Sequence, residues 1–231
     1  MLNNINKDNW ERPVYYAITI GDFPFNVAGQ RILEGINYRI VPGTVDLGGL
    51  NPEIMFDNMV NKYERGGIEN PNISLDENNL RMCRTFRMMF ASLVPALINE
   101  GKDEKALIAL DKCIEAIPGY TVPRGDESRV FANCYYVLGQ PEKARNIINE
   151  ITYRSGKSLD WFARMNANDM IACTYEIRDA LLTEIQILES YQQYDKTLYE
   201  AQRQKVISQT ELFLNNGVRF GENSHPLDYL M

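Results

Sequence analysis

The chain has 231 residues, of which 45% are hydrophobic and 24% charged, a composition typical of one or two globular domains with a real core. Its net charge of -7 argues against a nucleic-acid partner, which requires a basic surface, and against docking on anionic lipid. No segment approaches the roughly 20 consecutive apolar residues of a membrane span, and residues 1–8 lack the apolar core of a signal peptide.

The N-terminal part of the chain predicts two short β-strands. Residues 14–20 are rich in β-branched and aromatic side chains and end at a Gly-Asp pair. Residues 36–41 form the second strand, which ends at Pro42 and Gly43. Between them we expect a loop with one helical turn near residues 30–33. Because two strands alone make a marginal sheet, this part should be a small α+β element that leans on helices.

Capping signals mark the first helices. Asn51 and Pro52 are suited to the cap and first position of a helix, which should end at Gly66-Gly67. Ser74 and Glu77 have the spacing of a capping box and predict a long helix over residues 77–100. Pro95 lies inside that helix and should kink it.

A glycine followed by a regular set of small and apolar residues then occurs twice. The offsets are the same in the two copies, which are Gly101, Ala106, Leu110 and Cys113, and Gly139, Ala144, Ile148 and Ile151. With Pro118 closing the first copy, the pattern predicts helices over residues 103–117, 126–138 and 141–153. The spacing resembles the tetratricopeptide repeat, in which helices turn back at a small residue and approach closely at another.

Residues 159–192 and 195–215 predict two long helices that lack these glycine and alanine signals. We interpret them as a degenerate pair that caps the repeats. The expected fold is mainly α, with tetratricopeptide-like hairpins in an α–α superhelix and a small N-terminal α+β element. Its parts are residues 1–70 (α+β), 71–156 (two hairpins), 157–216 (capping pair) and 217–231 (irregular tail).

The sequence shows no set of residues typical of catalysis. Its one histidine, His225, lies near the C-terminus, where a general base is poorly held. The four cysteines contain no C-x-x-C pair and are interpreted as small buried hydrophobic residues, although a disulfide between Cys113 and Cys134 is conceivable. Acidic pairs at predicted helix starts are explained by the helix dipole. We therefore expect no catalytic residue, no cofactor and no metal in this chain.

Aromatic and basic residues near the two strands are the candidate recognition surface. Trp10, Tyr15, Tyr16 and Tyr38, with Arg12 and Arg39, suggest a groove for a peptide or a sugar. The alternative is that the rings form the core of the strands. The full candidate set is Trp10, Arg12, Tyr15, Tyr38, Arg39, Asn78 and Arg81.

A second resemblance covers roughly residues 7–155. The segments that carry it are N-W-E-R-P-V-Y from Asn9, Y-R-I-V-P from Tyr38, M-F-D-N from Met55 and L-D-E-N-N-L-R from Leu75. In this order they resemble the C-terminal, non-membrane region of the bacterial multi-spanning family called domain of unknown function 2723, which is related to protein O-mannosyltransferases. The resemblance implies a periplasmic domain tethered by transmembrane helices, with the catalytic acid and the lipid-sugar site in the membrane part.

Nothing in this chain matches that catalytic part, so the resemblance implies that the domain recognises an acceptor polypeptide or another protein subunit. Two alternatives remain open. The chain is a free-standing, cytoplasmic repeat adaptor that binds a peptide in its concave face, or it is an enzyme with a deep pocket of convergent carboxylates.

Overall fold

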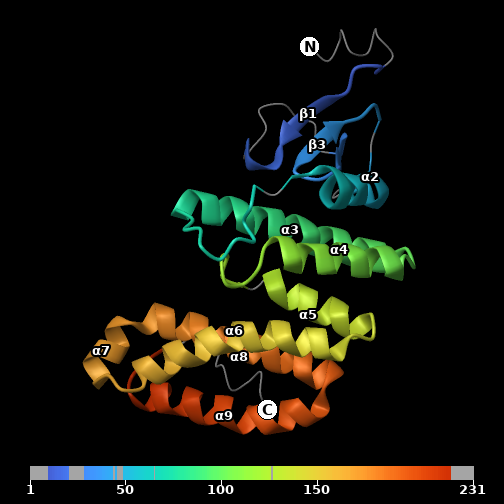
Figure 1. The fold of residues 1–231 in the computed structure, drawn as a ribbon. Coiled ribbons are helices and arrows are strands. Elements are labelled where there is room, and N and C mark those ends of the chain that lie inside the picture. The colour runs from blue at the N-terminus through green and yellow to red at the C-terminus, as the bar shows by residue number, and fades with distance from the viewer. Residues whose placement is uncertain are drawn as a thin grey trace. The chain divides into compact units, whose positions relative to one another are not determined.

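The computed structural model describes residues 10–20, 29–43, 45, 49–64, 66–125 and 127–219. The protein is mainly helical and carries a small three-stranded antiparallel sheet (Figure 1). The chain divides into two compact units, residues 1–123 and residues 124–231. Within the described residues, no helix is long and apolar enough to cross a bilayer. The expectations for residues 1–8 and for His225 lie outside the described residues.

The sheet of the first unit has three strands, in the order β1-β3-β2. They are β1 (Val14–Ala17), β2 (Arg31–Leu33) and β3 (Asn37–Ile40). The first expected strand is shorter than predicted, because Ile18–Ile20 form a 3-10 turn, η1. The helical turn expected near residues 30–33 is wrong, since this segment is the edge strand β2.

A tight turn at Gly35 explains the additional strand. Gly35 has a φ of 137°, and the N–H of Glu34 donates to the carbonyl of Asn37 at 3.0 Å, which closes the turn. Residues 31–33 are thereby folded back along β3, which satisfies their backbone hydrogen-bonding groups. Three residues are too few to show a strand periodicity in the sequence.

The helix after the sheet begins as predicted. It is α2 (Pro52–Phe56), and the side chain of its N-cap residue Asn51 accepts a hydrogen bond from the N–H of Ile54. The chain continues directly as a π-helical segment, η2 (Asp57–Lys62). There the amide of Asn58 donates to the carbonyl of Glu34 at 2.6 Å, which fastens this helical segment to the sheet.

The predicted long helix is confirmed as α3 (Glu77–Asn99), which contains Pro95 and packs against α4 (Asp103–Ala116). Its cap differs from the prediction. Asp76, and not Ser74, accepts a hydrogen bond from the N–H of Asn79, at 2.8 Å. Aspartate is among the strongest N-cap residues, and here it starts the helix two residues later than the capping box requires.

The turns at Gly101 and Gly139 have the same pattern of backbone hydrogen bonds. The two glycines have φ values of 71° and 70°. In the first turn the N–H of Lys102 donates to the carbonyl of Leu97, and in the second the N–H of Gln140 donates to the carbonyl of Tyr135. This is the hydrogen-bonding pattern of a Schellman helix end. The alanines five residues after each glycine, Ala106 and Ala144, are fully buried. Both features agree with the predicted glycine–alanine pattern.

The second unit consists of five helices among the described residues. They are α5 (Glu127–Val137), α6 (Pro141–Phe162), α7 (Ala167–Ala172), α8 (Thr174–Tyr194) and α9 (Lys196–Asn215). Helix α5 packs on α6, α6 on α8, and α8 on α9. The core of its distal end is formed by Leu159, Phe162, Met170, Ile177, Ala180, Leu181, Phe213 and Val218.

The single helix predicted over residues 159–192 is wrong. Helix α6 continues past the predicted end at residue 153 and ends at Phe162. A new helix starts at Asn166, whose side chain accepts a hydrogen bond from the N–H of Asp169 at 3.0 Å. The break lets Phe162 and Met170 enter one core cluster. In a continuous helix these two residues, eight positions apart, would lie about 12 Å apart along the axis.

An ion pair fixes the junction between α8 and α9. Asp195 is nearly buried and caps α9, with its Oδ1 accepting from the N–H of Leu198. Its Oδ2 accepts two hydrogen bonds from Arg145 of α6, from Nε at 3.0 Å and from Nη2 at 2.7 Å. This forked geometry joins three helices through one carboxylate.

The two turn glycines lead to a prediction with an internal control. Gly101→Ala and Gly139→Ala should each lower the free energy of unfolding by about 1–2 kcal/mol, because a left-handed backbone conformation is unfavourable for alanine. Gly156 lies inside α6, and a Cβ built there meets no atom within 4 Å. Gly156→Ala should therefore stabilise the protein by up to about 1 kcal/mol. Urea denaturation of the three variants measures these values, and equal effects at all three sites would contradict the turn assignment.

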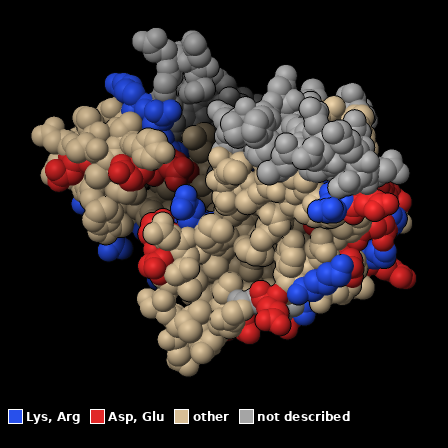
Figure 2. Space-filling model, turned by 90° about the horizontal axis from the view of Figure 1, so that it is seen from above, with Lys and Arg blue, Asp and Glu red and all other residues tan. Residues whose placement is uncertain are grey.

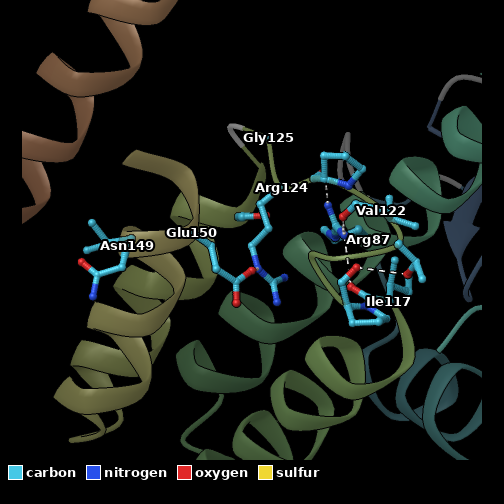
Figure 3. A network of polar contacts seen from close by, with 12 residues as sticks. Arg87, Ile117, Val122, Arg124, Gly125, Asn149 and Glu150 are labelled. Atoms are coloured by element: carbon cyan, nitrogen blue, oxygen red, sulfur yellow. Dashed lines mark hydrogen bonds and ion pairs between the residues drawn. The ribbon is translucent and has the colours of Figure 1, made fainter. Parts of the chain in front are cut away.

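A buried arginine organises the loop after α4. Arg87 of α3 is completely buried. Its guanidinium donates to three backbone carbonyls (Figure 3), those of Pro123 at 3.0 Å, Ile117 at 3.1 Å and Val122 at 2.6 Å. One side chain thus satisfies the carbonyl of Ile117, the C-cap residue of α4, and holds the following loop on α3.

Candidate recognition site

The sheet separates the aromatic residues that were predicted to form one groove. Tyr16 pairs with Tyr38 and Tyr15 pairs with Arg39, so alternation along the strands puts the two pairs on opposite faces. Tyr16 is buried and stacks on Tyr38, with ring centroids 5.3 Å apart. The cation over Tyr38 is Arg31, at 4.7 Å, a residue absent from the predicted set.

The opposite face of the sheet carries a small polar cluster around a buried carboxylate. Glu34 is 3% exposed, accepts a hydrogen bond from the hydroxyl of Tyr15 at 3.2 Å, and lies 3.5 Å from Nε of Arg39. Tyr15 and Arg39 are thus brought together, through a residue that the sequence did not single out. Their mutual pairing with Glu34 gives both residues a role in the packing of the sheet.

The other predicted residues lie elsewhere in the first unit. Trp10 is half-buried, has a φ of 60°, and packs against the cluster of Tyr16 and Ile40. Arg12 is exposed just before β1. Asn78 and Arg81 are exposed on the first turns of α3.

Charges of both signs are mixed on the surface, and the cysteines are free. On the face drawn in Figure 2, lysine and arginine side chains lie among aspartates and glutamates. In the described parts of the chain, no group of three or more His, Cys, Asp or Glu residues could hold a metal ion. All four cysteines are free thiols, and three of them are buried. Burial raises the pKa of the Cys134 thiol to about 11, so it stays protonated at neutral pH.

An apolar cleft of about 420 Å³ lies in the first unit, between η2, the loop that follows it, α3 and the end of α4. This volume is within the range of small-ligand pockets. Its apolar lining residues are Met59, Tyr63, Ile68, Ile73, Leu75, Met82, Cys83, Phe86, Phe90, Ala116 and Ile117. The cleft is thus lined mainly by apolar side chains, with Glu64 and Asn79 as its polar members.

The depth and the rim of the cleft have different properties. Met59, Phe90 and Ala116 are nearly inaccessible and form its base. At the rim, Met82 is 41% exposed, and an unbranched thioether side chain adapts readily to different shapes. Burial raises the pKa of the Cys83 thiol, which favours its neutral form and so adds to the apolar lining.

Three contacts hold the walls of the cleft in place. The ring of Tyr63 meets Phe86 edge to face, with centroids 6.3 Å apart. A Cβ at Gly35 would lie 2.5 Å from the Tyr63 hydroxyl oxygen, so the glycine allows Tyr63 to pack this closely against the sheet. On the other wall, the carbonyl of Ile117 is held by Arg87. The cleft is therefore built into the fold and does not depend on surface side chains alone.

Sequence reasoning missed this cleft because it depends on how η2, the loop and α3 fold together and on how the end of α4 packs against them, which no local pattern shows. The only local signal is Met82, an exposed apolar residue beside the buried Cys83 on α3.

Comparison with protein-family models, curated proteins and solved structures finds no match to this chain.

Proposed function

We propose that this chain is a non-catalytic recognition domain that binds a polypeptide segment through the apolar cleft of its first unit. The proposal includes the setting that the sequence resemblance implies, the extracytoplasmic side of a membrane glycosyltransferase-like protein. In that setting the bound segment belongs to the acceptor polypeptide, and the sugar transfer takes place in a membrane part that this chain does not contain.

The helical hairpins support the proposal. The turns at Gly101 and Gly139 share one hydrogen-bonding pattern, and each is followed by a fully buried alanine. We interpret the pairs α3–α4 and α5–α6 as tetratricopeptide-like hairpins. Proteins of this type use their helix surfaces to hold extended or helical peptides.

The cleft is the observation that carries the proposal. An apolar cavity of about 420 Å³ accommodates a leucine or phenylalanine side chain, and the adaptable Met82 lies at its rim. An unfolded polypeptide exposes such side chains, whereas a folded protein buries most of them. The cleft therefore favours unfolded chains as ligands.

A pair of methionines on α3 provides the test. Met82 lines the cleft, whereas Met88 is 53% exposed and does not line it. Met82→Asp should weaken the binding of a fluorescein-labelled peptide that contains Leu and Phe by about tenfold, because it puts a charge at the apolar rim. Met88→Asp should leave the dissociation constant unchanged. Fluorescence anisotropy measures both values.

The peptide itself supplies the second control. The same peptide with serine in place of Leu and Phe should bind the unmodified protein much more weakly. If the two peptides bind equally, or if both aspartate variants lose the same affinity, the cleft is not the binding site and the proposal is wrong.

A further inference from the structure

A second, more polar cleft lies in the second unit, independently of the site proposed above. Helices α6, α8 and α9 surround a cavity of about 300 Å³, with α8 packed against both of the others. Its lining is contributed by all three helices, for example by Thr152, Leu188 and Val206. The volume suits a ligand of the size of a single amino acid.

The unusual group in this cleft is Glu184 of α8. It is 7% exposed and lines the cavity. The hydroxyl of Ser155 donates a hydrogen bond to its Oε1 at 2.5 Å, and in the described part of the chain nothing hydrogen-bonds to Oε2. Burial raises the pKa of this carboxyl group, against the opposing effects of Ser155 and Lys205. A buried carboxylate with one free oxygen favours the approach of a cation.

Lys205 of α9 lines the same cavity. Its positive charge acts on Glu184, yet among the described residues the two groups form no ion pair within 4.0 Å. An acidic and a basic group thus line one cavity without forming an ion pair with each other. Asp160 is the other charged group that acts on Glu184, and it disfavours the carboxylate.

The remaining lining completes a small amphipathic site. Tyr191 also lines the cleft, and burial raises its pKa to about 12, so its hydroxyl remains a neutral hydrogen-bond donor. The aliphatic residues Ile187, Leu188 and Val206 provide an apolar surface, and all three are buried.

We propose that this cleft binds a free aliphatic α-amino acid. The ligand's ammonium group lies against Glu184, its carboxylate against Lys205 and the hydroxyl of Tyr191, and its side chain against Ile187, Leu188 and Val206. The zwitterion matches the pair of opposite charges, which neither an amine nor a carboxylic acid does alone.

Three related probes test this arrangement by isothermal titration calorimetry on the full chain. L-leucine carries both charges, L-leucinamide only the ammonium, and N-acetyl-L-leucine only the carboxylate. We expect L-leucine to bind at millimolar or lower concentration, L-leucinamide to bind about tenfold more weakly, and N-acetyl-L-leucine not to bind. No heat from L-leucine, or equal affinities for leucine and leucinamide, would overturn the proposal.

Matched variants assign the two charges. Glu184→Gln keeps the size of the side chain and an oxygen for Ser155, and it should reduce leucine affinity at least about tenfold. Lys205→Met should weaken leucine about tenfold and leave leucinamide unchanged. The controls are Glu200→Gln and Lys196→Met, exposed residues of α9 that do not line the cleft. Thermal unfolding without ligand shows that each variant is folded, and an unchanged leucine affinity in Glu184→Gln would refute the proposed site.

Discussion

Arg87→Met is expected to lower the free energy of unfolding by about 3–5 kcal/mol. The guanidinium of Arg87 satisfies three backbone carbonyls at the end of α4 and in the loop after it. Methionine fills much of the space but donates no hydrogen bond, so these carbonyls lose their partner where the side chain is fully buried. Leaving one such group unsatisfied costs about 1–3 kcal/mol.

Two neighbouring substitutions distinguish this effect from the loss of a positive charge. Arg84→Met removes an exposed arginine from the same helix, where the nearest carboxylate oxygen, of Glu77, is 3.9 Å away. It should change stability by less than about 0.5 kcal/mol. Arg87→Lys keeps the charge but loses the planar fork, so it should be nearly as damaging as Arg87→Met. Urea denaturation followed by circular dichroism measures all three, and a loss below 1 kcal/mol in Arg87→Met would contradict the proposed role.

Ala106→Leu and Ala144→Leu should each destabilise the protein by about 1–3 kcal/mol. Both alanines are fully buried in the first turn of a helix, five residues after the glycine that ends the preceding helix. A leucine adds three carbon atoms where neighbouring helices meet, and the close packing of a protein interior leaves little space for them.

Ala201 of α9 is the control for these two variants, because it is exposed. Ala201→Leu should change stability by less than about 0.5 kcal/mol. Thermal unfolding of the three variants under one set of conditions compares them directly. If the buried and exposed substitutions have equal effects, the alanines do not set the distance between the helices.

The features that were predictable from sequence are those that short segments determine. A glycine with positive φ and an alanine five residues later fix each hairpin turn within one short stretch, and both copies have the predicted turn. The errors occur where distant contacts decide between local alternatives. Residues 31–33 form a strand because they pair with the edge of β3. Helix α6 ends at Phe162, and the turn that follows brings Phe162 and Met170 into one core cluster.

The candidate sites were harder to predict for the same reason. The aromatic residues near the strands were predicted to line one groove, but alternation puts Tyr15 and Tyr16 on opposite faces of the sheet. The apolar cleft combines residues 59–90 with Ala116 and Ile117 at the end of α4. Glu184 did leave a signal, since it occupies one position in a regularly spaced buried stripe of α8 formed by Ile177, Leu181, Glu184, Leu188 and Tyr191. A carboxylate in such a stripe is expected either to pair with another group of the protein or to contact a ligand.

The packing order of the helices has a consequence for folding kinetics. The pairs α3–α4, α5–α6 and α8–α9 join helices that are neighbours in the chain, and short turns or loops connect them. Bringing such neighbours together costs little chain entropy, so each pair can form early and on its own. The slower steps should then be the closing of α6 onto α8 and the pairing of β1 with β3, which join segments separated by longer stretches of chain.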